Sequence, residues 1–225
     1  MMLARALGLY EPAKIAAVRQ FLKPGMTFVD VGGNKGDFAL LAAFLTGQSG
    51  AVLCFEPERE NCQWIHKSVE LNAYKNIGLH EIALSDRDGT APLYLGRKSG
   101  WHTLLSGQQR SDAGIILVRT AMLDSILTKL SVGKIDVMKI DVEGAELQVL
   151  DGARKTLLTN SHIVLLLDIH PRMGVNPHQV GSVLTKMGFS LHAMDHPLDG
   201  PVEITDHLRE LVAYRASGVR LQRIA

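Results

Sequence analysis

Short apolar runs alternate with longer stretches of helical periodicity along this chain, and that alternation limits its fold more than any other feature. Runs rich in Val, Ile and Leu are typical of strands buried on both faces, and the stretches between them have the period of crossover helices. We expect strands at 26–31, 51–56, 78–84, 134–141 and 162–168. The pattern predicts an α/β fold, a three-layer α/β/α sandwich around a mostly parallel sheet.

The last part of the chain predicts a different kind of pairing. Asn176 and Pro177 are typical of a helix start, and Gly188 of a helix end. The apolar runs at 189–194 and 211–214 have no obvious crossover helix between them. We therefore expect them to pair antiparallel as the last strands of the sheet.

A length of 225 residues is typical of one domain of this class. The N-terminal stretch predicts a helix at about 3–21. We divide the expected domain, 1–225, into an N-terminal helical extension at 1–22, a core at 25–171, and a C-terminal helix with an antiparallel hairpin at 172–225.

The composition favours a small-molecule partner. The chain has 24 basic and 23 acidic residues and no block of Lys or Arg, so no electrostatic footprint for nucleic acid or an anionic membrane is present. Its two cysteines provide neither a disulfide framework nor a zinc spacing. With no signal-peptide pattern and no apolar stretch of membrane-spanning length, the sequence predicts a cytoplasmic protein. The sequence does not indicate an oligomeric state.

The most informative motif is the glycine-rich segment Asp30-Val-Gly-Gly-Asn-Lys-Gly36, which follows the first expected strand. Ligands of open α/β sheets bind at this edge. Gly32 and Gly36 allow a tight backbone approach, and amides exposed near a helix start can hold a carboxylate. The nicotinamide-cofactor fingerprint has one more residue between its outer glycines, which argues against a dinucleotide. An ordinary glycine-rich turn is the alternative interpretation.

Glu56 ends the second expected strand, where a carboxylate can accept hydrogen bonds from both hydroxyls of a ribose. Such a carboxylate would also repel a 2′-phosphate. A strand-end Glu that serves only solubility is the alternative. Together with the glycine-rich segment, Glu56 predicts a nucleoside across the ends of the first two strands.

Six collinear segments of the chain resemble one known family. They are FVDVGGNKGDFALL, VLCFEPERENCQWIHKSVELN, IALSDRDG, VRTAMLDSIL, KIDVMKIDVEGAELQVLDGA and LLLDIHP. Over residues 26–171 this order is similar to that of the FkbM family of methyltransferases. The resemblance implies a Rossmann-like class I fold with seven strands and S-adenosylmethionine as methyl donor. It also implies O-methylation of a sugar or natural-product hydroxyl.

The resemblance also implies roles for individual residues. It places the methionine half of the cofactor against Asp30, Gly32, Gly33, Asn34 and Gly36, the ribose at Glu56, and the adenine at Ala83 and Leu84. The chain departs from the family pattern at Gly33, where Ala is usual, and at Asp168, where Glu is usual. We expect the first departure to be harmless, and the second leaves the role of Asp168 open.

A methyltransferase of this kind must position an acceptor oxygen and help to remove its proton. Asp141, which we also count among the cofactor-binding residues, is the leading candidate base. Strand alternation puts Lys139, Asp141 and Glu143 on one side, and all three are catalytic candidates. An ion pair between Lys139 and Asp141 is the structural alternative, because an unpaired buried lysine is costly.

Asp168 and His170 end the neighbouring expected strand. His170 is a second candidate base, or else a hydrogen-bonded surface residue. Asp141 and Asp168 have the oxygen ligands for a Mg²⁺ site, although we do not favour a metal here. Trp101 and His102, in a long loop at 97–114, are candidates for contact with the acceptor.

Two other functions stay open at this point. One is a nicotinamide-dependent oxidoreductase, which the glycine spacing disfavours. The other is a non-catalytic module that binds S-adenosylmethionine and serves as a partner or scaffold.

Overall fold

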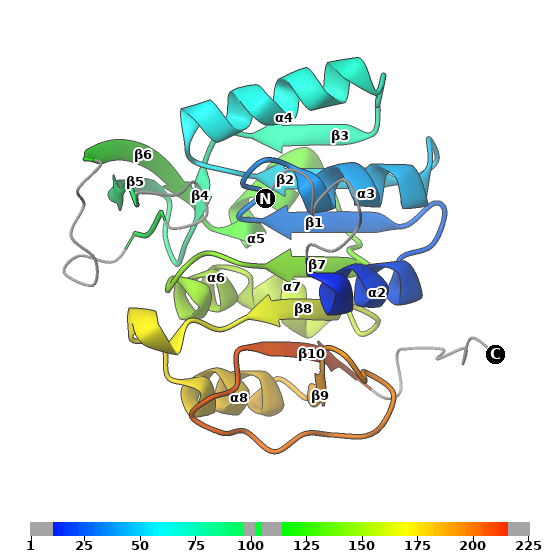
Figure 1. The fold of residues 1–225 in the computed structure, drawn as a ribbon, viewed down its shortest axis with the longest axis vertical. Helices are drawn as coiled ribbons and strands as arrows, with labels where there is room; N and C mark the ends of the chain where they lie inside the picture. The colour runs from blue at the N-terminus through cyan, green and yellow to red at the C-terminus, as the bar shows by residue number, and fades with distance from the viewer. Residues whose placement is uncertain (1–10, 97–101, 105–113, 216–225) are drawn as a thin grey trace.

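The computed structural model describes residues 11–96, 102–104 and 114–215. Its main sheet has seven strands in the order β3 (Ile77–His80), β2 (Ala51–Phe55), β1 (Thr27–Val31), β7 (Val137–Ile140), β8 (Val164–Asp168), β10 (Glu210–Tyr214) and β9 (Ser190–Ala193) (Figure 1). The pairs from β3 to β8 are parallel, and β10 is antiparallel to both of its neighbours. The predicted mostly parallel sheet with an antiparallel last strand is confirmed.

Helices cover both faces of this sheet. One apolar cluster joins the sheet to α2 (Pro12–Phe21), α3 (Asp37–Thr46) and α4 (Arg59–Leu71). The other joins it to α5 (Leu123–Leu130), α6 (Glu146–Gly152), α7 (Arg154–Thr159) and α8 (Pro177–Lys186). The strands between the clusters are buried on both sides, which explains their nearly continuous apolar runs. The three-layer arrangement is therefore confirmed (Figure 1).

The apolar patterns at 91–95 and 115–119 indicate two further strands, but their grouping into a second, small sheet was not predicted. It consists of β4 (Ala83–Leu84), β6 (Ile115–Ala121) and β5 (Gly89–Tyr94), and it lies beyond the carboxyl ends of β1 to β3 (Figure 1). The single strand expected at 78–84 is wrong, because the Ile82 amide donates to the His80 carbonyl and this turn ends β3. Ala83 and Leu84 then pair with β6 in the small sheet.

Local signals at the ends of the chain agree with the structure where it describes them. The Asn176 side chain caps α8 by accepting from the His178 amide at 2.8 Å. The expected N-terminal helix is present from Pro12 onward, and its earlier part lies outside the described residues. A 3₁₀ turn at Pro171–Met173 follows β8. Among the described helices, none has the length and apolar character needed to cross a bilayer.

Candidate active site

The glycine-rich segment forms the loop between β1 and α3. Gly32 has φ +78°, and a Cβ added to it would lie 1.9 Å from the carbonyl oxygen of Asp141. Only glycine fits this position, because both the backbone conformation and the close approach exclude a side chain. The loop after β1 is thus packed directly against the chain that leaves β7.

The amides of this loop are committed to the protein itself. Gly32 and Gly33 both donate to the Phe55 carbonyl at 3.0 Å, Asn34 donates to Glu56, and Gly36 donates to Gly33. These four amides thus have acceptors within the protein, and the Asn34 amide holds the carboxylate of Glu56. Whether loop amides also hold a cofactor carboxylate stays a prediction. The loop is a preformed turn anchored to the end of β2.

Gly33 is shaped by its neighbour on β2. A Cβ at this position would lie 2.4 Å from the Cys54 sulfur, which is itself fully buried. Glycine therefore fits beside Cys54 where alanine would clash. The expectation that this departure is harmless to the site stays a prediction. The absence of a side chain at Gly33 leaves the space that the Cys54 sulfur fills.

Glu56 follows β2 and is only 5% exposed. Its carboxylate accepts from the Asn34 amide at 2.7 Å, from the Glu58 amide at 2.9 Å and from the Asn61 side chain at 3.3 Å. Burial raises the pKa of Glu56 to about 7, although these hydrogen bonds oppose the rise. Glu56 joins the glycine loop to the start of α4. Its two oxygens can accept about four hydrogen bonds, so the carboxylate can accept one more from a hydroxyl.

The same loop has an unused acceptor that suits a bound cofactor. The Asn34 side-chain oxygen is buried and has no hydrogen-bond partner within the described part of the chain. Buried acceptors of this kind are rare unless a ligand or water completes them. An ammonium group such as that of the methionine half of S-adenosylmethionine is a suitable donor. On this test the residues present fit that cofactor.

Lys139 lies beneath the loop and joins β7 to β1. It is 3% exposed, and its ammonium lies 2.9 Å from the Gly32 carbonyl, 3.2 Å from Asp30 and 3.6 Å from Asp141. The predicted ion pair between Lys139 and Asp141 is confirmed. Asp30 is fully buried and is the register partner of Lys139, so its side chain supports the loop from below.

Asp141 is held strongly ionised. Burial would raise its pKa, but Lys139, Lys14 and His170 outweigh burial and lower the pKa of Asp141 to about 2. A carboxylate with so low a pKa is a weak proton acceptor. This environment favours an electrostatic role for Asp141 over the role of base.

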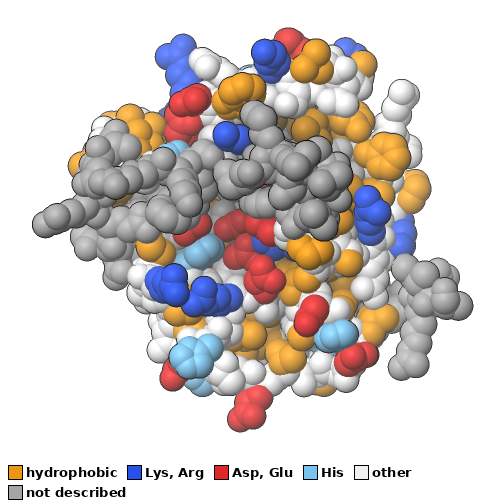
Figure 2. Space-filling model, in the orientation of Figure 1, with side chains coloured by type: hydrophobic (Ala, Val, Ile, Leu, Met, Phe, Trp, Pro, Cys, Tyr) orange, Lys and Arg blue, Asp and Glu red, His pale blue; other side chains and the backbone are white. Residues whose placement is uncertain are grey.

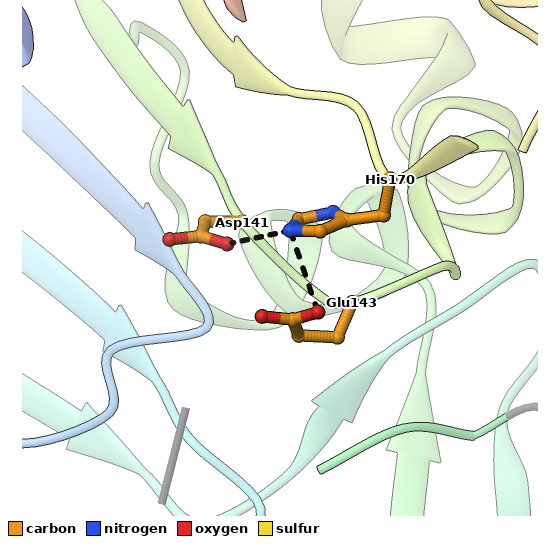
Figure 3. Close-up of side chains that lie close together, drawn as sticks. All are labelled: Asp141, Glu143 and His170. Carbon is orange, nitrogen blue, oxygen red and sulfur yellow. Dashed lines mark ion pairs between the residues drawn. The ribbon is translucent and has the colours of Figure 1, made fainter. Parts of the chain in front are cut away.

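His170 follows β8, and its imidazole faces the carboxylates of Asp141 and Glu143 (Figure 3). Its Nδ1 is bonded to Glu146, while its Nε2 lies 3.5 Å from Glu143 and 3.7 Å from Asp141. Burial works to lower the pKa of His170, but Glu146 and the other two carboxylates raise it to about 9. His170 is therefore a partly buried residue whose ring is oriented by Glu146 and whose raised pKa favours the charged form.

Glu146 was missed by the sequence interpretation. It is the first residue of α6, is 0% exposed, and also accepts from the Gly144 amide at 3.2 Å. A signal was present, because Glu146 shares one helix face with the buried residues Val149 and Leu150. A charged residue on an apolar helix face indicates a specific buried partner.

Glu143 faces His170 from the turn between β7 and α6. Its backbone has φ +50°, a conformation that costs energy for a residue with a side chain and that is enriched at functional sites. Burial raises the pKa of Glu143 to about 7, with His170 acting in the opposite direction. Of the predicted candidates, Glu143 is thus the carboxylate whose pKa lies nearest neutrality at this edge.

Lys14 enters this region from helix α2 and was also missed. It is 1% exposed, and its ammonium is bonded to Asp168, lies 2.7 Å from Glu11 and lies 4.0 Å from Asp141. Burial works to lower the pKa of Lys14, but Asp168 and Asp141 raise it above its ordinary value. In the orientation of Figure 1, acidic side chains gather near the middle of the visible face, with a histidine beside them (Figure 2).

Among the described residues, two groups of ligand-type side chains are close enough to share an ion. They are Asp141 with Glu143 and His170, and Glu11 with Asp141 and Asp168. The Mg²⁺ site expected at Asp141 and Asp168 is thus geometrically compact, and whether a metal binds stays a prediction.

The remaining predicted residues lie in the small sheet and its surroundings. Ala83 and Leu84 are 5% and 3% exposed and pack into apolar clusters, so their contact with adenine stays a prediction. His102 accepts from the Gly96 amide at 3.1 Å through Nδ1. Trp101 lies outside the described residues, and acceptor contact by either residue is untested.

The order and direction of the strands are those of the class I methyltransferase fold. Among similar solved structures are an FkbM methyltransferase from Methylobacillus flagellatus KT (TM-score 0.56, 16% identity, 84% of this chain and 43% of that one) and precorrin-6y C5,15-methyltransferase from Geobacter metallireducens GS-15 (TM-score 0.55, 12% identity, 92% and 88%). At these identities the likeness shows the fold alone.

The methyltransferase FkbM domain matches residues 30–191, and the chain belongs to this family. The match includes α8 and reaches β9, beyond the core boundary expected at residue 171. Family and fold together support S-adenosylmethionine as the cofactor, which disfavours the nicotinamide alternative.

Two curated relatives match part of the chain. The 2-O-methyltransferase NoeI of Sinorhizobium fredii is 30% identical over 60% of this chain and 60% of that protein. Methyltransferase 1 of Beauveria bassiana is 26% identical over 55% of this chain and 57% of that protein. The chain thus spans less than two thirds of the length of either relative.

Proposed function

We propose that this protein transfers a methyl group from S-adenosylmethionine to a hydroxyl oxygen of a small molecule, such as a sugar or natural product, within a single domain. The observation that carries the acceptor chemistry is Glu143, a carboxylate with a pKa near 7 beside the oriented imidazolium of His170. The name of the relative NoeI, a 2-O-methyltransferase, supports an oxygen acceptor.

In this proposal the residues at the ends of β1 and β2 would hold the cofactor. The Asn34 side-chain oxygen would bind its ammonium group, and Glu56 would bind its ribose hydroxyls. Because the Asn34 amide and Glu58 amide already occupy Glu56, we expect the loop to adjust when a nucleoside binds. Gly32 and Gly36 shape the loop, while Asp30 and Lys139 support it from below.

S-adenosylmethionine supplies an activated methyl group, so the residues of this chain have to handle the proton of the acceptor. The Glu143 carboxylate would accept the hydroxyl proton. The methyl–sulfur bond of the donor would break as the methyl–oxygen bond forms, which would leave a methyl ether and S-adenosylhomocysteine. A base with a pKa near the working pH is the most effective and is worth roughly 10²–10⁴-fold in rate.

His170 and Glu146 act as positioning residues for this base. Glu146 accepts the Nδ1 proton of His170 and fixes the ring, which directs Nε2 toward Glu143. His170 and Glu143 interact closely, so they titrate as a pair. This arrangement moves our assignment of the base from Asp141 to Glu143.

Isotope transfer tests the proposed reaction. The protein is incubated with S-adenosylmethionine that carries a trideuterated methyl group and with a panel of hydroxylated sugars and natural-product extracts. Mass spectrometry should detect a trideuteromethyl ether. A product methylated only on nitrogen would overturn the oxygen assignment.

Calorimetry with S-adenosylhomocysteine tests the cofactor site independently of the acceptor. We expect saturable binding by the wild type, strong weakening in Glu56→Ala, and no change in the control Glu70→Gln, an exposed residue of α4. Wild-type protein that shows no saturable heat would contradict the proposal, and so would undiminished binding by Glu56→Ala. A protein that binds but methylates nothing would support the non-catalytic alternative.

A further inference from the structure

Lys14 carries an inference that goes beyond the proposed reaction. It lies on α2, before the segment that the family matches, yet its ammonium reaches the carboxyl ends of β7 and β8. Three carboxylates surround this ammonium, those of Glu11, Asp141 and Asp168. They are the same three whose oxygens lie within 4.8 Å of one another in one of the two groups compact enough for an ion.

The position of Lys14 in its helix shows that its burial is built into the packing. Ala17, Val18 and Phe21 share its buried face, and the ammonium also lies 5.5 Å from the centre of the Phe38 ring. A lysine on this apolar face is costly unless it is paired, and the carboxylates provide the pairing. A compact ammonium with three donors matches a ring of three carboxylates.

We propose that Lys14 is the resident cation of this carboxylate group, and that its ammonium takes the place that a divalent metal ion would take between Glu11, Asp141 and Asp168. Helix α2 thus completes the site electrostatically, by neutralising Asp141 and Asp168 with a charge that belongs to the chain. The proposal concerns cation binding and does not depend on the identity of the methyl acceptor.

The inference predicts that removing the ammonium exposes a metal site. Oxygen ligands from carboxylates suit Mg²⁺ and Mn²⁺. The second oxygen of Asp168, Oδ1, is buried without a hydrogen-bond partner among the described residues, so it is available to such an ion. Without Lys14 the cation that remains beside the group is Lys139, which Asp30 and Asp141 share, so the group gains net negative charge that a dication would neutralise.

Titration with MnCl₂ in a chelator-treated buffer tests the inference, with Mn²⁺ binding followed by electron paramagnetic resonance. The proteins are wild type, Lys14→Met, Lys14→Arg and the double variant Lys14→Met/Asp168→Asn, with Asp168→Asn as reference. We expect Lys14→Met to bind Mn²⁺ at least about tenfold more tightly than wild type, since a unit charge at close range is removed. Lys14→Arg, which keeps the charge, and the double variant should lack this gain.

Two results would overturn the inference. One is wild-type Mn²⁺ binding that Asp168→Asn abolishes, because the site would then be open to metal despite Lys14. The other is a folded Lys14→Met that binds Mn²⁺ no better than wild type. If Lys14→Met does not fold, Lys14→Gln replaces it, and the comparison of wild type with Asp168→Asn still decides the first result.

The functional consequence has its own measurement. In the metal-free buffer Lys14→Met should lose turnover, and Mg²⁺ should restore part of it in that variant but not raise the wild-type rate. Calorimetry with S-adenosylhomocysteine shows which of the two proposals has failed. If Lys14→Met still binds S-adenosylhomocysteine but gains no Mn²⁺ site, the inference about Lys14 is wrong while the proposed function stands.

Discussion

The two halves of the site are built in different ways. The cofactor edge, which we define as the loop 32–36 with Glu56, is made mainly of backbone contacts within one continuous stretch of chain. The acceptor edge, which we define as Asp141, Glu143, Glu146, Asp168 and His170, is made of charged side chains and also receives Lys14 from α2. Shape therefore dominates at the first edge and charge balance at the second.

This difference determines what a substitution should do at each edge. A change of volume in the cofactor edge disturbs backbone packing and nucleoside binding. A change of charge in the acceptor edge leaves the backbone in place but alters proton transfer and the pairing of its neighbours. Lys139 is the residue common to both, because it contacts Asp30 under the loop and Asp141 at the end of β7.

The largest expected effect separates the two edges by function. Glu143→Gln should lower turnover by roughly 10²–10⁴-fold, since it removes the proposed base, while S-adenosylhomocysteine binds as in wild type. Wild-type turnover should rise with pH to a plateau above about 7, where Glu143 is ionised, and Glu143→Gln should lose this rise. Steady-state kinetics across pH, beside calorimetry, provide the measurement. Full turnover in Glu143→Gln would return the role of base to Asp141 or His170.

Much of the fold and of the cofactor edge could be predicted because their signals are local. Apolar runs indicated the strands, and the loop with Glu56 lies at the strand ends where the sequence put it. The small sheet escaped prediction because the two-residue strand β4 exists only through pairing with β6, more than thirty residues away.

The acceptor edge was predicted less completely, because its geometry depends on partners far apart in the chain. Asp141, Glu143 and His170 were recognised, but Glu146 and Lys14 were not. Both have a local signal, since each is a charge on the buried face of its own helix. Their partners were not visible in the sequence, because packing alone brings α2 and α6 to the ends of β7 and β8.

The second prediction concerns Lys139. Lys139→Met should destabilise the protein by about 3–5 kcal/mol, because the fully buried Asp30 is left without its cation. Lys139→Met/Asp30→Asn should recover part of this loss, and urea unfolding of the four proteins in the cycle gives the coupling. If the losses of stability in Lys139→Met and Asp30→Asn simply add in the double variant, the two residues are not coupled. Lys139 would then not connect the two edges energetically.

The third prediction assigns separate pH windows to Glu56 and His170. Glu56 has a pKa raised from 4.5 to about 7, so the folded protein retains a proton that the unfolded chain has lost, and stability falls as pH rises through this window. His170 has a pKa raised from 6.5 to about 9, so its stabilisation is complete below 6.5 and is lost as pH rises through 9. Each shift corresponds to about 3 kcal/mol.

Urea unfolding at pH 5, 7 and 9 checks these windows. Glu56→Gln should reduce the loss of stability between pH 5 and 7, to which Glu143 also contributes, and should keep the later loss. His170→Gln should remove the later loss and keep the earlier one. If both variants flatten the same window, Glu56 and His170 do not titrate independently.

The smallest expected effect tests whether shape dominates the cofactor edge. Gly33 does not have a positive φ, so the cost of Gly33→Ala comes from the 2.4 Å approach of its Cβ to the Cys54 sulfur. We expect a loss of about 1–3 kcal/mol, as for other overpacked cores, and recovery of most of it in Gly33→Ala/Cys54→Ala. Gly133→Ala, where a Cβ meets open space, is the matched control in urea unfolding. If adding Cys54→Ala to Gly33→Ala recovers no stability, the strain of Gly33→Ala lies in the backbone of the loop. The contrast between the two edges would then depend on backbone conformation and not on side-chain volume.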